Sequence, residues 1–261
     1  MSHNLSITQT GAVARITLTQ PEVRNAFSDE VIAEITAAFT EVGARADVRC
    51  VVLAAEGPAF CAGANLNWMR RMADYTREEN IADAGKLAEM LRVIYECPQP
   101  TIARVQGDVY AGGMGLVAAC DMAVSVDTAG FCLSEVKLGL IPATISPYVI
   151  RAMGARAAQR YFLTAERFDA AEALRTGFVQ AVVAADALDA KVDELARALT
   201  SASPNAVRAC KKLVHDVAER EIDAQLIAVT VEGIADIRAS EEGREGVQSF
   251  LQKRKPAWLL A

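Results

Sequence analysis

The stretch from Ala111 to Pro142 constrains the fold of this chain more than any other. Gly112, in the turn AGGMG, precedes Glu135 in FCLSEVKLGLIP by 23 residues. A second turn of small residues, AFCAGANL, begins at Ala59. Short apolar runs lie before both turns and are typical of buried strands. Glycine permits tight turns and the close approach of a ligand to the backbone. The pattern therefore predicts an α/β fold with two functional turns between strands and helices.

The first half of the chain alternates signals for strands and helices. Polar and apolar residues alternate around Gly11, which predicts a β-hairpin. Ser28, followed by two acidic residues, predicts the start of a helix. The apolar run at residues 50–56 predicts a buried parallel strand. Residues 77–96 have apolar positions at helical spacing, and residues 101–105 predict the strand that enters the glycine turn.

After Pro142 the pattern becomes helical. Apolar residues at helical spacing predict four amphipathic helices near residues 188–199, 207–217, 222–238 and 246–253. We therefore predict a core of residues 1–185 and a helical C-terminal region of residues 186–261.

Composition excludes several classes of protein. The net charge of −6 over 261 residues argues against a nucleic-acid binder, which needs a basic face. No apolar run approaches the roughly 18 residues that a membrane span requires. The N-terminal residues lack the pattern of a signal peptide, so we expect a cytoplasmic protein. The six cysteines form no CxxC pair, which predicts reduced thiols in the core rather than disulfides or metal ligands.

Backbone N–H groups at the two turns are candidates for binding negative charge. A turn that opens a helix exposes such groups, and the helix dipole adds to their attraction for an anion. Ala64 would present its N–H at the second turn. Two donors from separate turns would form an oxyanion hole, which is worth about 3–4 kcal/mol per donor in a transition state. From the local sequence alone, tight packing explains the glycine turn as well as anion binding does, and it explains the second turn better than anion binding does.

Glu135 is the candidate acid–base group. Its neighbours are apolar, and desolvation raises the pKa of a carboxyl group toward the range useful for proton transfer. The alternative from the local sequence is an ion pair with Lys137 at a strand edge. Asp108 and Asp121 flank the glycine turn, and we expect them to cap or anchor structure.

Seven segments, taken together and in order, resemble the crotonase (enoyl-CoA hydratase/isomerase) superfamily. They are PEVRNAFS, AFCAGANL, VQGDVYAGG, CDMAV, SEVKLGLIP, LTAERFDAAEALRTGFV and FLQKRKPAW. The resemblance covers almost the whole chain. It implies a spiral ββα core, a helical C-terminal trimerisation region, and a homotrimer or a hexamer built as a dimer of trimers. It also implies acyl-CoA thioester substrates without a metal or redox cofactor, coenzyme A being part of the substrate.

The resemblance also implies roles for individual residues. By position, Ala64 and Gly112 resemble the two N–H donors that hold the thioester oxygen. Contacts with coenzyme A are implied at five positions, which are Ala26, Ala62, Leu66, Phe250 and Lys253. Asn65 stands where Asp is commoner, a departure expected to affect packing more than mechanism.

Gly115 is the departure that matters for chemistry. Typical hydratases have a glutamate at this position and a second one at the position of Glu135, so that two carboxylates hold the attacking water. One carboxylate suffices for an isomerase. The segments GANLNWMRRM and SEVKLGLIPATISPYV, however, are more similar to the bacterial methylglutaconyl-CoA hydratase branch, whose members can lack the first acid.

Three functions follow from this comparison. The first is a hydratase of a branched enoyl-CoA, such as 3-methylglutaconyl-CoA, with Glu135 as acid and base. The second is a Δ3,Δ2-enoyl-CoA isomerase that uses Glu135 as its single proton shuttle. The third is a non-catalytic acyl-CoA-binding or RNA-associated paralogue. The presence of Glu135 beside both turns argues against an inactive protein, and the net charge argues against RNA.

Overall fold

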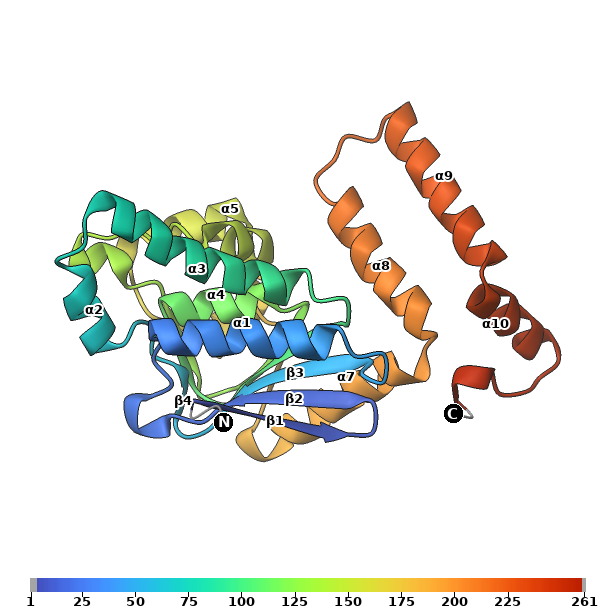
Figure 1. Cartoon of the computed structure of the whole chain (residues 1–261), viewed down its shortest axis with the longest axis horizontal. Coiled ribbons are helices and arrows are strands. Elements are labelled where there is room, and N and C mark those ends of the chain that lie inside the picture. Colours follow the sequence, from blue (N-terminus) through green and yellow to red (C-terminus); the bar gives the residue numbers. More distant parts are fainter. Residues whose placement is uncertain (1–3, 260–261) are drawn as a thin grey trace.

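Two β-sheets form the core of the molecule, and helices cover them (Figure 1). The computed structural model describes residues 4–259. The six-stranded sheet has the order β1 (Leu5–Thr10), β2 (Val13–Leu18), β3 (Cys50–Ala55), β5 (Thr101–Val105), β7 (Met122–Val126) and β10 (Ala181–Val183). The four-stranded sheet has the order β4 (Ala59–Cys61), β6 (Asp108–Tyr110), β8 (Gly130–Cys132) and β9 (Phe168–Asp169). β1–β2 and β8–β9 pair antiparallel, and the other pairs are parallel.

The helices of the core lie between and after these strands. They are α1 (Asp29–Gly43), α2 (Leu66–Met72), α3 (Arg77–Tyr95), α4 (Gly112–Ala119), α5 (Ser146–Thr164), α6 (Ala170–Arg175) and α7 (Leu188–Ser201). Three helices follow them, α8 (Pro204–Val217), α9 (Ala224–Ala239) and α10 (Glu241–Leu251). The short 3-10 helices are η1 (Pro21–Val23), η2 (Glu135–Leu138), η3 (Ala185–Ala187) and η4 (Ala257–Leu259). Within residues 4–259, no helix is both long enough and apolar enough to cross a bilayer.

The core repeats a ββα unit. β3 and β4 precede α2 and α3, β5 and β6 precede α4, and β7 and β8 precede α5. Each unit contributes its first strand to the larger sheet and its second strand to the smaller one. This is the spiral ββα arrangement that the resemblance implies.

Parallel pairing in the smaller sheet positions the functional segments. β4 pairs with β6, and β6 pairs with β8, both in parallel. The carboxyl ends of parallel strands lie at the same edge of a sheet, which is where open α/β sheets bind ligands. The turn after Cys61, the turn after Tyr110 and the segment from Cys132 to Glu135 therefore meet at one edge.

Most sequence-predicted elements are confirmed. The hairpin is β1–β2, and the Ser28 side chain caps α1 by accepting a hydrogen bond from Val31 N. The four C-terminal helices are α7 to α10. Sequence patterns did not predict α5, α6 or the strands β4, β6 and β9 of the smaller sheet, whereas the apolar run FCL at residues 131–133 predicts the remaining strand, β8. Gly154, at φ 79°, interrupts the helical geometry of α5, so its apolar residues do not follow one continuous period.

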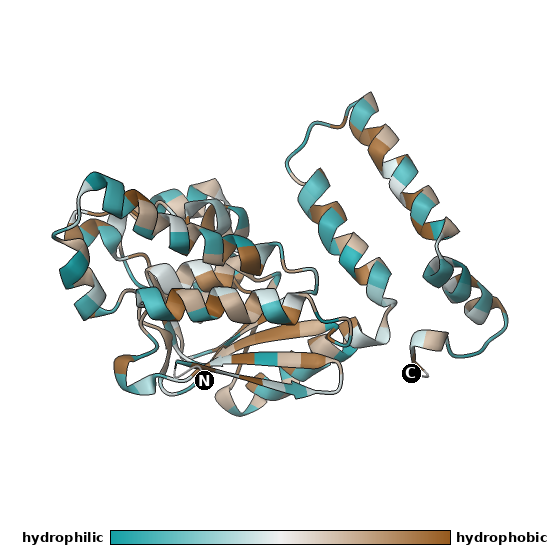
Figure 2. Cartoon of the chain, in the orientation of Figure 1, coloured by the Kyte–Doolittle hydropathy of each residue, from teal (hydrophilic) through white to brown (hydrophobic). Residues whose placement is uncertain are grey.

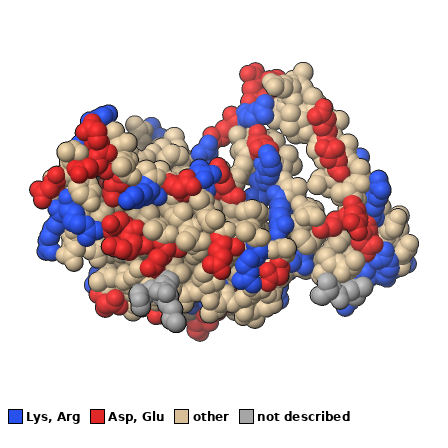
Figure 3. Space-filling view, in the orientation of Figure 1, with Lys and Arg blue, Asp and Glu red and all other residues tan. Residues whose placement is uncertain are grey.

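The C-terminal helices differ in what they pack against. α7 packs on β3, β5 and β7 of the core, and its residues Leu188, Val192 and Ala196 are buried. α8 to α10 form an arm beside the core (Figure 1). The arm carries apolar bands (Figure 2) in which large side chains such as Val214, Val231 and Phe250 are exposed within residues 4–259, and Leu226 is the one buried residue of α9. Figure 3 shows open space between α8 and α9.

Candidate active site

The turn at Ala64 is held by a short parallel bridge. Phe27 N donates to Gly63 O (2.7 Å), and Asn65 N donates to Phe27 O (2.7 Å). Phe27 thus bonds to the residues on either side of Ala64, as parallel pairing requires. The Ala64 N–H therefore points away from Phe27, and within residues 4–259 it donates to no protein acceptor.

Gly112 lies against the same phenylalanine. A Cβ atom at Gly112 would stand 2.5 Å from Phe27 Cε2, so only glycine fits. Gly112 is the first residue of α4, and its N–H makes no hydrogen bond with the described residues. Ala111 precedes it with φ 46° and ψ −119°, a conformation that costs a non-glycine residue about 1–3 kcal/mol. Such strain is often found at functional turns.

The two turns touch each other. A Cβ atom at Gly63 would lie 3.0 Å from Ala111 Cβ and 3.3 Å from Tyr110 O. The turns are in contact, and the Ala64 and Gly112 N–H groups each lack an acceptor within residues 4–259. Two such backbone donors on adjacent turns are the groups from which an oxyanion hole can be built.

Glu135 begins the 3-10 helix η2 after β8. Burial raises the pKa of its carboxyl group above the usual value of 4.5. Its Oε2 atom is buried and has no hydrogen-bond partner in the part of the chain that the structure describes. The alternative ion pair with Lys137 does not form among these residues. A buried carboxylate oxygen without a partner costs free energy unless a ligand uses it.

Gly115 is enclosed by apolar side chains. A Cβ atom there would stand 2.4 Å from Ile145 Cγ2 and 3.3 Å from Leu91 Cδ2. Ile145 and Leu91 are themselves buried. The volume that a side chain at position 115 would need is therefore already filled. Ile145 and Leu91 occupy the space in which typical hydratases would place a glutamate side chain.

The residues implied to contact coenzyme A fall into two groups. Ala26 precedes Phe27, and Ala62 N donates to Arg24 O (3.0 Å), so both lie beside the donor turns. Leu66 begins α2 and is 69% exposed. Phe250, in α10, and Lys253, just after it, lie on the arm, away from α2 and α4 (Figure 1). Within one chain, the structure does not bring the arm to the site.

Two residues of the site were missed from the sequence. Phe27 contacts both donor turns, and Asn25 holds the segment before it. The buried Asn25 donates from Nδ2 to Glu56 O and Ala59 O, both at 2.9 Å, and its Oδ1 accepts from Gln20 N (3.0 Å). The one sequence signal was an asparagine next to apolar residues in PEVRNAFS.

The aspartates beside the glycine turn anchor structure, as predicted. Asp108 accepts from Gly130 N (2.7 Å) and Arg167 Nη2 (2.9 Å). Asp121 accepts from Thr101 N (2.7 Å) and Lys211 Nζ (2.8 Å). Neither carboxylate is free to act on a substrate.

The cysteines are free thiols, as predicted, but not all belong to the core. Cys210 is exposed on α8, a helix in which no residue is buried, so its assignment to the core was wrong. Burial raises the pKa of Cys61 to about 12, which makes this thiol unreactive. No group of three or more His, Cys, Asp or Glu side chains within residues 4–259 is arranged to hold a metal ion.

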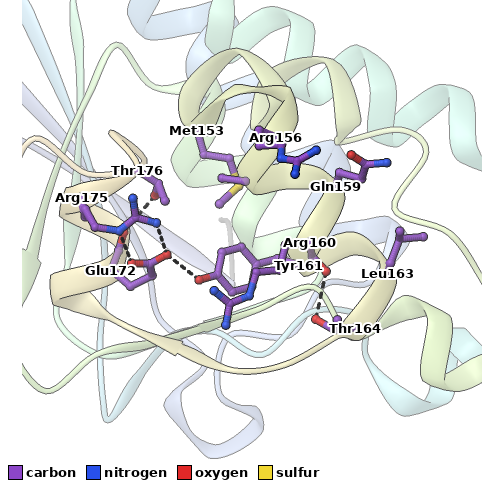
Figure 4. A pocket seen from close by; sticks show the side chains of 11 residues that line it. Met153, Arg156, Gln159, Arg160, Tyr161, Leu163, Thr164, Glu172, Arg175 and Thr176 are labelled. Carbon is purple, nitrogen blue, oxygen red and sulfur yellow. Dashed lines mark hydrogen bonds and ion pairs between the residues drawn. The ribbon is translucent and has the colours of Figure 1, made fainter.

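The hollow drawn in Figure 4 is separate from this site. It has a volume of about 670 Å³, and its lining residues come from α5, α6 and the residue after α6. Glu172 there accepts from Tyr161 Oη (2.6 Å) and pairs with Arg175 (2.6 Å), and Arg160 pairs with Glu166 (2.6 Å). Because its polar groups largely satisfy one another, we assign the chemistry to the sheet edge with the donor turns and Glu135.

Comparison with known proteins agrees with this geometry. A sequence model described as enoyl-CoA hydratase/isomerase matches residues 8–259. The chain is 33% identical over 249 residues to an enoyl-CoA hydratase of Alternaria alternata, covering 94% of this chain and 80% of that protein. It is similar to the crystal structure of an enoyl-CoA hydratase from Shewanella pealeana, with 44% identity, a TM-score of 0.95, and 98% and 96% of the two chains covered.

Pseudomonas aeruginosa AtuE is a further solved structure of similar fold. It shows 35% identity and a TM-score of 0.93, with 98% of this chain and 99% of that chain covered. The match spans the core and the arm alike. Fold, site geometry and relatives thus lead to one conclusion: this chain belongs to the enoyl-CoA hydratase/isomerase family and has the crotonase fold.

Proposed function

We propose that this protein is a hydratase that adds water across the 2,3 double bond of a branched enoyl-CoA, 3-methylglutaconyl-CoA or a similar thioester. The observation that carries the proposal is the buried, unpaired Oε2 of Glu135, located at the same sheet edge as two turns with free N–H groups. A thioester oxygen between the turns and a water molecule at Glu135 would satisfy all three groups.

The reaction follows from these groups. The N–H groups of Ala64 and Gly112 bind the thioester oxygen and stabilise the negative charge that forms on it. The Glu135 carboxylate removes a proton from water as the water oxygen bonds to C3, which yields an enolate. Glu135 then delivers that proton to C2, and the thioester carbonyl returns. The raised pKa of Glu135 makes its carboxylate a stronger base toward water, and the carboxylic acid that then forms is still acidic enough to protonate the enolate at C2.

The packing around Gly115 supports the proposal that the substrate itself carries a carboxylate. A second carboxylate cannot enter between Ile145 and Leu91 without rearrangement. In this proposal the distal carboxylate of a glutaconyl-type substrate helps to position the water. Coenzyme A enters as part of the substrate, and because hydration changes no net oxidation state, no redox cofactor takes part.

The same observation favours a second candidate, a Δ3,Δ2-enoyl-CoA isomerase. Isomerisation moves one proton from C2 to C4 and needs one carboxylate, which is what this site contains. Here Glu135 would remove and return the proton without water.

Ultraviolet absorbance distinguishes these functions. Purified protein is mixed separately with 3-methylglutaconyl-CoA, crotonyl-CoA and a 3-enoyl-CoA. Hydration removes the absorbance of the conjugated enoyl thioester, whereas isomerisation into conjugation creates it. We expect loss with 3-methylglutaconyl-CoA and little change with crotonyl-CoA. A gain with the 3-enoyl substrate alone would instead identify an isomerase, and no change with any substrate would indicate a binding protein.

We also propose that the protein is a homotrimer, or a hexamer of two trimers. The apolar bands of the arm are exposed in a single chain, which supports burial against other copies. In such an assembly Phe250 and Lys253 could contact coenzyme A bound to a neighbouring copy, because Phe250 is 82% exposed in its own chain.

A further inference from the structure

Helix α2 is joined directly to one of the proposed donors. Ala64 is followed by Asn65, which caps α2 by accepting a hydrogen bond at Oδ1 from Asn67 N (2.9 Å). α2 has seven residues, and a helix this short is not stable without contacts to its surroundings. The bridge to Phe27 fixes the backbone on both sides of Ala64, and α2 begins two residues after it, so the orientation of the Ala64 N–H depends on this bridge and on what holds α2.

Trp68 provides the main contact between α2 and the rest of the protein. It is the buried residue of α2, 4% exposed, whereas Leu66 in the same helix is 69% exposed. Its indole Nε1–H donates to Asp83 Oδ1 in α3 (3.2 Å). A buried indole N–H needs an acceptor, and a hydrogen bond to a charged group is stronger than one between neutral groups. This bond fixes α2 against α3.

A second contact holds the other end of α2 more weakly. Arg71 forms an ion pair with Asp29 at the start of α1. The two side chains are 46% and 36% exposed, and ion pairs this exposed contribute little to stability because water screens them. Of the two contacts, the buried one therefore dominates.

We propose that the hydrogen bond between Trp68 and Asp83 is a positioning contact for catalysis: by fixing α2 against α3 it aims the Ala64 N–H at the thioester oxygen. Trp68 and Asp83 act through Ala64 and do not touch the reacting atoms. The inference rests on the proposed function, because it takes Ala64 as an oxyanion donor. It assigns a role to two side chains that have none in the reaction itself.

The test measures the oxyanion hole without turnover. Butyryl-CoA labelled with ¹³C at its carbonyl is saturated and cannot be hydrated, and hydrogen bonds lower the infrared stretching frequency of its carbonyl. Four variants are compared with the natural protein. Trp68→Phe keeps one aromatic ring but removes the N–H and part of the indole, Asp83→Leu removes the acceptor, Asp83→Asn keeps an acceptor oxygen, and Arg71→Gln breaks the exposed ion pair as the matched control.

We expect Trp68→Phe and Asp83→Leu to lose at least about half of the frequency shift that the natural protein produces. With the hydration substrate we expect their kcat to fall about 10-fold or more, and KM to change less than about 3-fold, because misplacement of a donor acts on the transition state. Asp83→Asn and Arg71→Gln should keep the full shift and most of kcat. A contact important only for stability would lower the melting temperature and leave the shift intact.

Two results would overturn the inference: a full frequency shift in Trp68→Phe, or an equal loss in Asp83→Asn and Asp83→Leu. If Asp83→Leu does not fold, Trp68→Phe and Asp83→Asn decide alone. The proposed function can fail separately. A carbonyl shift in the natural protein without hydration of any enoyl-CoA rejects the hydratase and leaves the positioning contact in place, whereas no shift in the natural protein rejects both.

Discussion

At the scale of single residues, the role proposed for Glu135 conflicts with its contribution to stability. Its carboxylate oxygen Oε2 is buried without a partner among the described residues. A bound substrate or water would donate a hydrogen bond to that oxygen. Without a ligand, the oxygen makes no hydrogen bond that stabilises the fold. Removing the charge should therefore harm catalysis and help the fold.

Glu135→Gln should lower kcat of the proposed hydration at least about 10²-fold, the usual contribution of a positioned acid–base group. Steady-state absorbance assays measure this loss. Binding of butyryl-CoA, followed by calorimetry, serves as the control and should change little, because the amide has nearly the same shape. Turnover close to that of the natural protein would reject Glu135 as the acid–base residue.

The raised pKa of Glu135 predicts how activity and stability depend on pH. Only the ionised form accepts a proton from water, so kcat/KM should fall with acid around a pKa above 4.5, the usual value. Since the folded-state pKa is above that of the unfolded chain, the stabilisation linked to this group is present at low pH and is lost as pH rises through the folded pKa. Glu135→Gln should then melt about 2–4 °C higher at pH 8 and show little difference at pH 4. A lower melting temperature at pH 8 contradicts this.

Gly115 and Ile145 should behave as a coupled pair. Alanine is favoured over glycine in a helix by about 1 kcal/mol, but overpacking a core costs about 1–3 kcal/mol. With a Cβ contact of 2.4 Å the second effect dominates, so Gly115→Ala should destabilise the protein. Ile145→Ala removes the Cγ2 methyl group but keeps Cβ, which would lie 2.9 Å from the added Cβ, so it relieves the clash in part. The double variant should therefore be more stable than the sum of the single effects predicts. Chemical unfolding of all four proteins measures the coupling, and simple additivity would show that the two positions do not compete for space.

At the scale of elements, the glycine turn combines strain with function. Ala111 has φ 46°, which glycine adopts freely. Ala111→Gly should therefore raise the free energy of unfolding by up to about 1 kcal/mol. Ala119→Gly, in the buried last turn of the same helix α4, is the matched control and should lower it by about 1 kcal/mol. Thermal unfolding of both variants measures the difference, and a destabilised Ala111→Gly variant would mean that the Ala111 methyl group contributes more packing than strain.

At the scale of the whole molecule, the arm of a single chain leaves large apolar side chains exposed. Ile227, Val231 and Ile234 lie on one face of α9 and are 52%, 58% and 48% exposed. Replacing Ile227 and Val231 together by Glu should convert the proposed trimer or hexamer to monomers, because charged groups are costly to bury in an apolar interface. Sedimentation analysis gives the mass, and Glu232→Lys, about 130° around the helix from this face, is the control. A monomeric natural protein would reject the assembly. The cytoplasmic location stays a prediction.

The sequence alone determined the local elements and the candidate groups of the site. Its periodicity predicted the hairpin, α1, α3 and the C-terminal helices, since these depend on local apolar spacing and capping. Its resemblance to known enzymes implied roles for Ala64, Gly112 and Glu135. Chain order could not show that these three, spread over 72 positions, meet at one sheet edge. That is decided by the parallel pairing of β4, β6 and β8, three-residue strands of which the sequence pattern indicated only β8.

Only the tertiary structure decided how the site is supported and enclosed. Phe27 serves both donor turns, Trp68 reaches Asp83 in another helix, and Ile145 fills the space beside Gly115. Each of these is a contact between residues distant in sequence, formed when separate elements pack, and no local pattern encodes it. Glu135 shows what each level determines. Its apolar neighbours in sequence suggested a desolvated acid. The lack of a hydrogen-bond partner for its Oε2 within the described residues, however, depends on how all the surrounding elements pack.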